Sequence, residues 1–225
     1  MSKRQELLEK IIITSLSLKS DRSRILYDYA FVNEHGFYGC VVDTASLSIF
    51  EPGLPKNNKL ISAINYPYQG LNKDSVLDCF VKTFAVMNSE SMGFISSLDK
   101  IDVESGDYEQ IRSFLSEVSE LSDIEKRVAL EFSWIKSDEH LSKILSVIAP
   151  YEDIRLVFSG FINSPKDIKE VRQFSKMCKL SGYENYEYFG PIPQRISNAF
   201  SIIEMGYKTI GTPSFMIPKL INDKI

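Results

Sequence analysis

The side chains that could do chemistry lie where short apolar segments of the sequence end. The segment Leu98–Val103 reads as a β-strand, and its period of two places Asp102 on one side of that strand. A carboxylate that faces the inside of a fold is costly to bury without a partner, and its pKa can be tuned for acid or base chemistry. Asp102 is therefore a candidate catalytic residue. The alternative is a structural ion pair, whose candidate members are Lys100, Arg127, Asp102 and Glu131.

An amine and a thiol are the other groups that could act as nucleophiles. Lys136 follows the fifth predicted strand and is the lysine that we place in a loop at a strand end. A deprotonated lysine amine forms Schiff bases with carbonyl compounds. Cys40 would need a neighbouring base, but His35 and His140 fall on predicted helix ends. We therefore interpret Cys40 as a buried structural thiol.

Glycines after predicted strands could bind an anion. The segments "YFGPI" (Tyr188–Ile192) and "IGTPSF" (Ile210–Phe215) each place a glycine where a strand gives way to a helix. Exposed backbone N–H groups at such points can hold a phosphate. The candidate phosphate-binding set is Ser159, Gly160, Gly190, Gly211 and Ser214. Glycine after a strand also simply makes a turn, and Pro191 and Pro213 each remove one donor.

An alternation of short apolar segments with amphipathic ones must position these candidates. The short segments, which we predict to be strands, are Ile11–Leu16, Phe37–Val42, Leu60–Ile64, Leu98–Val103, Arg127–Phe132, Ile154–Phe158, Asn185–Phe189 and Lys208–Gly211. Between them lie segments with helix-start residues, such as Asp107 and Ser137. Parallel strands need long crossover connections, so strands separated by helices predict βαβ units.

Eight such units predict an α/β fold, a single-domain (β/α)8 TIM barrel over residues 1–225 with Met1–Lys10 as an extra N-terminal capping helix. No internal repeat, low-complexity tract or linker divides the chain. An open doubly wound sheet is the alternative, and it would require one or two weak strands to be something else. In a barrel of this kind the functional site lies at the C-terminal ends of the strands.

Composition excludes several classes of partner. The 225 residues carry a net charge of −4 from interspersed acids and bases, without the Lys and Arg cluster that nucleic-acid binding requires. Three widely spaced cysteines suggest neither a disulfide framework nor a zinc site, and we expect no metal or other cofactor. The start of the chain lacks the apolar core of a signal peptide, and no apolar run approaches the roughly 18 residues of a membrane span. We expect a cytoplasmic protein without membrane contact.

Several segments, in order, resemble the deoxyribose-phosphate aldolase family, a class I aldolase barrel of similar length. These segments are "GFYGCVVDTAS", "SAINYPYQG", "IDVESGDYEQI", "VALEF" and "GYKTIGTPS". The resemblance covers nearly the whole chain and rests on the order and spacing of the segments. It implies a barrel fold and a small phosphorylated or carbonyl-bearing ligand.

The resemblance also implies that the usual amines are missing. The family's sixth strand ends in Lys-Thr-Ser-Thr-Gly-Phe, and its lysine forms the Schiff base. Aligned on "SGF" (Ser159–Phe161), that lysine corresponds to Leu156. A second family lysine, on strand seven, corresponds to Glu187, and the strand-four aspartate corresponds to Asp102. Leucine cannot form a Schiff base. The resemblance therefore implies an altered site in which Asp102 and Glu187 face the ligand.

Three functions are consistent with these patterns. The first is a diverged aldolase barrel that binds a small phosphorylated sugar or carbonyl compound without Schiff-base chemistry. The second is an active carbon–carbon lyase in which Lys136 is the amine and Asp102 or Glu131 moves the proton. The third is a non-catalytic barrel that acts as a protein-interaction or regulatory subunit through aromatic-rich loops, Tyr66–Tyr68 and Tyr183–Phe189. A homodimer is compatible with all three.

Overall fold

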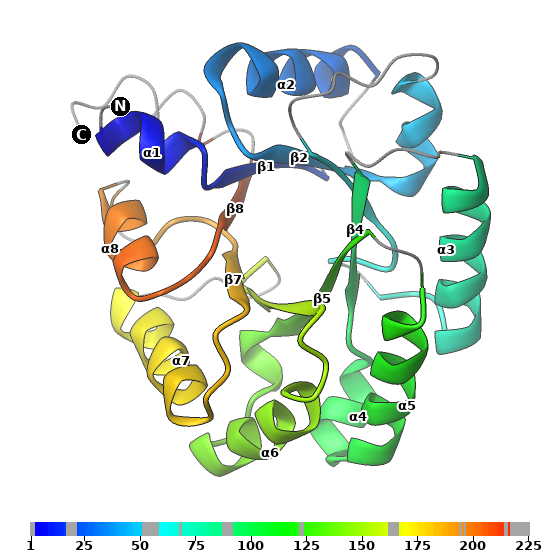
Figure 1. Ribbon diagram of the computed structural model, residues 1–225, viewed down its shortest axis with the longest axis vertical. Coiled ribbons are helices and arrows are strands. Elements are labelled where there is room, and N and C mark those ends of the chain that lie inside the picture. The colour runs from blue at the N-terminus through cyan, green and yellow to red at the C-terminus, as the bar shows by residue number, and fades with distance from the viewer. Residues whose placement is uncertain are drawn as a thin grey trace.

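The strands form a closed parallel barrel (Figure 1). The computed structural model describes residues 3–16, 22–50, 59–67, 69–86, 92–121, 124–161, 167–193, 195, 197–213 and 216. The strands are β1 (Ile11–Ser15), β2 (Gly39–Asp43), β3 (Lys59–Ala63), β4 (Met92–Ser97), β5 (Glu125–Glu131), β6 (Ile154–Ser159), β7 (Tyr186–Phe189) and β8 (Ile210–Pro213). Each strand pairs in parallel with the next, and β8 pairs with β1. The predicted (β/α)8 barrel is confirmed, and the open sheet is excluded because the ring closes.

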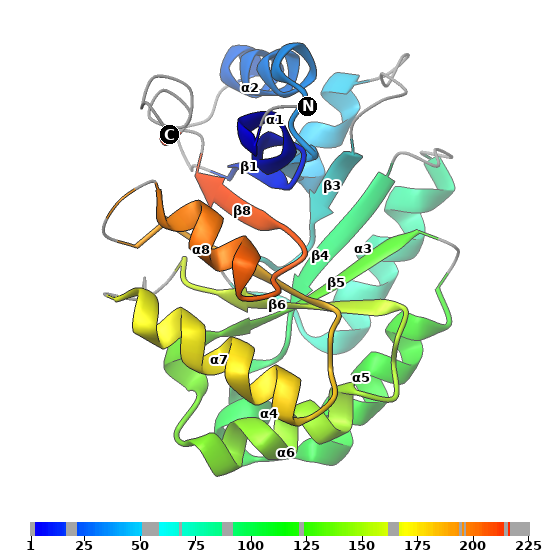
Figure 2. The same ribbon diagram turned by 60° about the vertical axis from the view of Figure 1, so that its left-hand side comes forward.

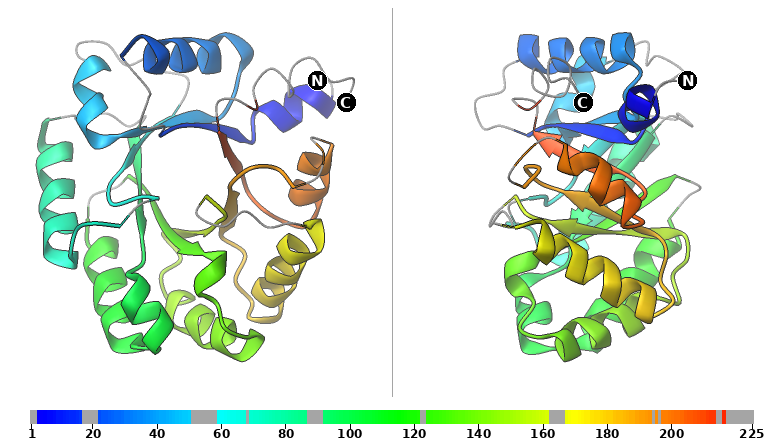
Figure 3. Two further views of the ribbon diagram at one scale, coloured as in Figure 1. Left: turned by 180° about the vertical axis from the view of Figure 1, so that it is seen from behind. Right: turned by 90° about the vertical axis from the view of Figure 1, so that its left-hand side faces the viewer.

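Helices surround the strands, as Figure 3 shows from two further sides. They are α1 (Lys3–Leu8), α2 (Arg22–His35), α3 (Lys73–Val86), α4 (Lys100–Ser105), α5 (Tyr108–Ser119), α6 (Asp138–Ile148), α7 (Ile168–Leu180) and α8 (Asn198–Glu204), with 3-10 helices η1 (Thr44–Phe50) and η2 (Phe132–Trp134). The N-terminal helix α1 lies outside the ring of strands between α8 and α2 (Figure 1). Figure 2 shows α7 and α8 on the outer side of β6 and β8.

Side-chain caps begin several of these helices, as the sequence predicts. The Asp107 carboxylate accepts a hydrogen bond from the N–H of Gln110 at 3.2 Å, and the Ser137 hydroxyl oxygen accepts one from His140 at 3.1 Å. These bonds satisfy N–H groups that have no partner inside the helix. The caps therefore fix where the loops at the C-terminal ends of the strands give way to helices.

The fourth strand lies earlier in the chain than we predict. β4 is Met92–Ser97, whereas the predicted strand Leu98–Val103 forms a turn and the helix α4. The Asp99 carboxylate accepts hydrogen bonds from the N–H groups of Ile101 and Asp102, at 2.7 and 3.3 Å, and so begins that helix. The prediction is wrong because a glycine and two serines make the true strand less apolar than the helical turn after it.

Two apolar clusters hold the barrel together. The larger one lies between the strands and the surrounding helices, and it includes outward-facing strand residues such as Ile13, Leu156 and Phe158. The smaller one fills the middle of the barrel with inward-facing residues, among them Ile12 and Val157. Neighbouring positions on one strand thus belong to different clusters, which follows from the two-residue period of a strand.

Candidate functional site at the barrel mouth

The inside of the barrel is layered along its axis. Charged side chains fill the N-terminal end, apolar ones fill the middle, and polar ones lie at the C-terminal ends of the strands. The apolar layer is Ile12, Val41, Ile61, Ala63, Tyr66, Ile95, Ala129, Val157 and Phe189. Barrels of this kind place their functional groups at the C-terminal ends. The polar layer there, which we call the barrel mouth, is therefore the candidate site.

The barrel mouth is formed by the last inward-facing residues of several strands. They are Thr14 on β1, Ser97 on β4, Glu131 on β5 and Ser159 on β6. Each lies two residues beyond a member of the apolar layer and so shares its inward face. None of these side chains belongs to a residue that is more than 6% exposed. The mouth is therefore a buried, polar layer.

Tyr66 packs its ring in the apolar layer and reaches the mouth with its hydroxyl. Its hydroxyl lies 3.4 Å from the Ser159 hydroxyl, and its ring stands edge-on to the rings of Phe161 and Phe189. Burial raises the pKa of Tyr66 well above its ordinary value. The Ser159 hydrogen bond lowers that pKa and the charge of Glu131 raises it. Tyr66 is therefore a neutral phenol, able to donate a hydrogen bond.

The loop after β3 holds Tyr66 in this position. Asn65 has a left-handed backbone with φ of 58°, and its side-chain oxygen accepts hydrogen bonds from the N–H groups of Gly70 and Leu71 at 2.7 and 3.0 Å. Its amide nitrogen donates to the Leu71 carbonyl oxygen at 3.1 Å. The loop therefore closes on Asn65, and the next residue turns its ring toward the barrel axis.

Glu131, Ser159 and Tyr66 together suit proton transfer on a carbonyl compound. Glu131 lies opposite Ser159 in the pairing of β5 with β6, and its charge acts on Tyr66. A carboxylate can take a proton from carbon next to a carbonyl group. A phenol or a hydroxyl can donate a hydrogen bond to the carbonyl oxygen. The arrangement offers both functions without a covalent intermediate.

Leu156 does not face the barrel mouth. Its side chain packs in the outer cluster, whereas Arg155, Val157 and Ser159 face inward. A lysine at position 156 would therefore point toward the helices. The alignment on "SGF" selects an outward position of β6, and the inward position at the level of the apolar layer is Val157.

Asp102 and Lys136 are not among the mouth residues, and they line different hollows. Asp102 is on α4 and lines a hollow between helices, so its expected place on a strand is wrong. The Lys136 ammonium donates a hydrogen bond to the carbonyl oxygen of Glu104, and Lys136 lines a different hollow, beside Phe132 and Asp138. The structure does not bring the two residues together. Their roles as amine and proton shuttle stay predictions.

Gly160 and Gly190 lie at the ends of β6 and β7, but their N–H groups already have acceptors. The N–H of Gly160 donates to the Phe189 carbonyl oxygen at 2.7 Å, and that of Gly190 donates to the Gly211 carbonyl oxygen at 2.8 Å. A Cβ on Gly211 would lie 2.4 Å from the Phe189 ring. Gly211 therefore serves close strand packing, and the N–H groups of Gly160 and Gly190 continue the pairing of the strands. Ser214 lies outside the described residues, and phosphate binding by this set stays a prediction.

Glu187 lies in the charged layer, at the opposite end of the barrel from the mouth. Arg127 donates to it at 2.8 Å and Arg155 at 2.9 Å, and Glu187 is fully buried. Arg127 also lies 2.9 Å from Glu125, which accepts a hydrogen bond from Tyr38. These contacts correct the expectation that Glu187 faces a ligand. The predicted ion pair in the barrel lining exists, but its carboxylates are Glu187 and Glu125.

The closed ring of eight parallel strands defines the class of this protein, an α/β barrel with the fold of deoxyribose-phosphate aldolases. The solved structure titled "QR15, an Aldolase" matches 97% of this chain and 99% of its own, with a TM-score of 0.76 and 18% identity. A tetrameric deoxyribose phosphate aldolase from Aeropyrum pernix matches 94% of this chain and 88% of its own, with a TM-score of 0.71 and 16% identity. At such identities the likeness is one of fold.

The chain has matches among solved structures but none by sequence. No family model matches the chain, and no curated protein matches it. Within the described ranges, none of the helices has the length and apolar character needed to span a bilayer. The resemblance drawn from short segments of the sequence is thus supported by the fold that those segments adopt.

Proposed function

We propose that the protein binds a small carbonyl compound at the barrel mouth through hydrogen bonds, without forming a Schiff base. The observation that carries this proposal is the polar set of Tyr66, Glu131 and Ser159 directly above an apolar layer. Lysine occurs on the strands at two positions. Lys59 begins β3 at the N-terminal end, and Lys126 donates to Asp153 outside the barrel at 2.7 Å. Neither supplies an amine to the mouth.

The charge of the mouth favours an unphosphorylated ligand. Glu131 is 2% exposed, and a buried carboxylate repels a phosphate dianion. The N–H groups of Gly160 and Gly190 already donate to strand carbonyls. We therefore prefer a neutral hydroxyaldehyde or hydroxyketone to a sugar phosphate. Tyr66 and Ser159 would donate hydrogen bonds to its carbonyl oxygen, and Glu131 would accept one from its hydroxyl group.

Paired ligands test this proposal. We would measure binding of glyceraldehyde and of its phosphate, and of deoxyribose and its phosphate, by calorimetry. The unphosphorylated member of each pair should bind more tightly. Tyr66→Phe should weaken that binding by about 0.5–1.5 kcal/mol, the typical net value of one hydrogen bond. Tyr27→Phe, at a ring that is 58% exposed on α2, should leave it unchanged. Tighter binding of both phosphates would contradict the proposal.

Borohydride reduction in the presence of an aldehyde separates this proposal from a lyase that uses Lys136. We expect no saturable adduct on Lys136, because its ammonium is hydrogen-bonded to Glu104. The exposed Lys143 is the control for adventitious labelling, since it lies on α6 and pairs with Glu139 at 2.9 Å. A stoichiometric adduct on Lys136 that exceeds the Lys143 background would overturn the proposal.

Assembly and location are also proposals. We propose a homodimer, and light scattering of the purified chain tests it. The Aeropyrum pernix neighbour is a tetramer, which supports self-association but not a particular number of subunits. We propose a reducing, cytoplasmic location, supported by the free thiols of Cys40, Cys79 and Cys178. Fluorescence microscopy of the tagged chain tests that location.

A further inference from the structure

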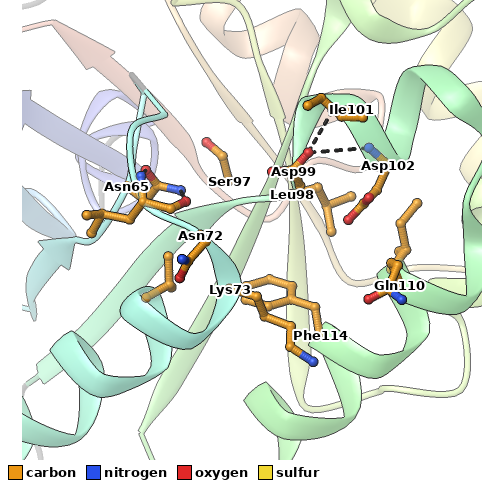
Figure 4. Close-up of a pocket in the computed structure, with 13 residues that line it drawn as sticks. Asn65, Asn72, Lys73, Ser97, Leu98, Asp99, Ile101, Asp102, Gln110 and Phe114 are labelled. Atoms are coloured by element: carbon orange, nitrogen blue, oxygen red, sulfur yellow. Dashed lines mark hydrogen bonds between the residues drawn. The ribbon is translucent and has the colours of Figure 1, made fainter.

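The hollow that Asp102 lines adjoins the barrel mouth and extends outward between α3, α4 and α5 (Figure 4). Its volume is about 260 Å³. Small-molecule sites typically measure roughly 300–1,000 Å³, so this hollow suits a small organic molecule. Its apolar lining consists of Leu71, Val76, Leu98, Ile101, Ile111 and Phe114. We call it the α4 pocket.

Polar groups without partners line the α4 pocket. Among the described residues, three lining side chains have no hydrogen bond or ion pair to the protein. They are the Asp102 carboxylate, the Ser97 hydroxyl and the Gln110 amide. Ser97 is 6% exposed and lines the pocket, so it is a polar group within reach of a bound molecule. A molecule that displaces water from these groups must offer them hydrogen bonds, so the occupant carries a polar group. Figure 4 shows Asp102 and Gln110 on the side opposite Asn72.

The neighbouring charged groups in the lining already have partners. The Asp99 carboxylate caps α4 through the N–H of Ile101. The Lys73 ammonium donates to the Ser113 hydroxyl at 3.0 Å and forms an ion pair with Glu117. Lys73 therefore does not neutralise Asp102 by direct contact. Asp102 is the acid of this pocket that remains available to a ligand.

The electrostatic surroundings of Asp102 favour a cation. Burial raises the pKa of Asp102, the charges of Asp99 and Asp107 raise it further, and only Lys73 lowers it. A positive charge beside Asp102 would relieve this repulsion. In the described part of the chain, no group of three His, Cys, Asp or Glu residues is placed to hold a metal ion. An organic cation is therefore the better fit.

The entrance of the α4 pocket is apolar. Ile101 is 75% exposed and Leu71 is 41% exposed, and both line the pocket. Large apolar side chains at the rim of a polar hollow mark a place where an apolar group binds. The occupant therefore combines one positive charge with a compact apolar part.

We propose that the α4 pocket binds a small apolar amine, whose ammonium pairs with Asp102 and donates hydrogen bonds to Ser97 and Gln110. The apolar part of the amine lies against Leu98 and Phe114. This site does not depend on carbonyl binding at the barrel mouth. Its ligand is a cation, whereas a phosphate is an anion. The side chains that bind it are not Tyr66, Glu131 or Ser159.

Three probes of the same shape and different charge test the proposal. We would titrate the protein with benzylamine, benzyl alcohol and benzoate and follow backbone amide resonances by NMR. Benzylamine should bind most tightly and shift resonances of α4 and α5, and Asp102→Asn should weaken its binding about tenfold, as loss of a charged hydrogen bond predicts. Glu109→Gln, which removes a charge of the same sign at an 81% exposed side chain on α5, should change its affinity less than twofold.

The remaining outcomes each decide the question. Equal binding of benzylamine to the native chain and the Asp102→Asn variant would overturn the proposal, as would preferred binding of benzoate. Weak shifts spread over the surface would show an unspecific interaction and would also overturn it. Tyr66→Phe should leave benzylamine binding unchanged, so failure of this site and failure of the carbonyl site are distinguishable.

Discussion

Arg127 and Glu187 form a two-point ion pair inside the barrel. Arg127 Nε lies 2.8 Å from Glu187 Oε2, Nη2 lies 3.3 Å from Oε1, and neither side chain is exposed. Burial alone would lower the pKa of Arg127, but Glu187 and Glu125 raise it above its ordinary value. A buried charge persists in a fold only when it is paired in this way. The N-terminal end of the barrel is therefore closed by matched charges, and the opposite end is left for the site.

Glu187→Gln should destabilise the protein strongly. The change removes one of the two carboxylates that Arg127 and Arg155 share and leaves them with Glu125, and breaking a buried pair typically costs about 3–5 kcal/mol. Urea unfolding at neutral pH measures the loss. Glu139→Gln is the control, because Glu139 is 79% exposed and pairs with Lys143 on the surface of α6. A loss below about 1 kcal/mol for Glu187→Gln would show that the pair is not structural.

The barrel could be predicted from the sequence because each strand is marked locally. Runs such as Ile11–Leu16 and Ile154–Phe158 are apolar, and each is followed by a segment with a helix-starting residue. Seven of the predicted strands overlap the observed ones, and the exception is Leu98–Val103. There, one helical turn with Ile101 outside and Val103 inside imitates the alternation of a strand, because Ile101 is 75% exposed and Val103 fully buried.

The site was harder to predict because it depends on contacts between distant strands. The alternation of Arg127, Ala129 and Glu131 shows that one face of β5 is polar at both ends. It does not show which residues of the other strands contact that face. Glu187 comes from β7, and the pairing that brings it to Arg127 forms only when the ring closes. The sequence predicts Ser159 from its place at a strand end, whereas its contact with Tyr66 depends on the geometry of the loop after β3.

Gly211→Ala should destabilise the barrel through a steric clash. A Cβ at this position would lie 2.4 Å from the Phe189 ring, which fills the middle of the barrel and cannot move aside freely. Overpacking of this kind typically costs about 1–3 kcal/mol. Gly70→Ala is the matched control, since a Cβ there meets nothing within 4 Å. Thermal unfolding compares the two variants, and equal stability of both would refute the role of Gly211 in packing.

Acid should weaken the charged layer through Glu125. Burial would raise the pKa of Glu125, but Arg127 and Arg155 lower it below the ordinary value of 4.5. A carboxyl whose folded-state pKa is depressed stabilises the fold fully above its unfolded-state pKa, and this stabilisation is lost as the pH falls through the folded-state value. We therefore expect Glu125→Gln to be less stable than the native chain at pH 7, with a difference that shrinks below about pH 4.5. Urea midpoints across this range measure it. A difference that grows on acidification would contradict the assignment.

The thiols should differ in reactivity because the fold buries two of them. Cys40 and Cys178 are fully buried, and burial raises the pKa of both, which reduces the reactive thiolate. Cys79 on α3 is half-buried and its sulfur is free of any disulfide. An aromatic disulfide reagent should therefore modify one thiol rapidly in the native protein and all three in urea. Cys79→Ser should abolish the rapid phase, whereas Cys178→Ser should preserve it. Rapid modification that survives the Cys79→Ser change would mean that the outer cluster opens around Cys40 or Cys178 far more often than its burial implies.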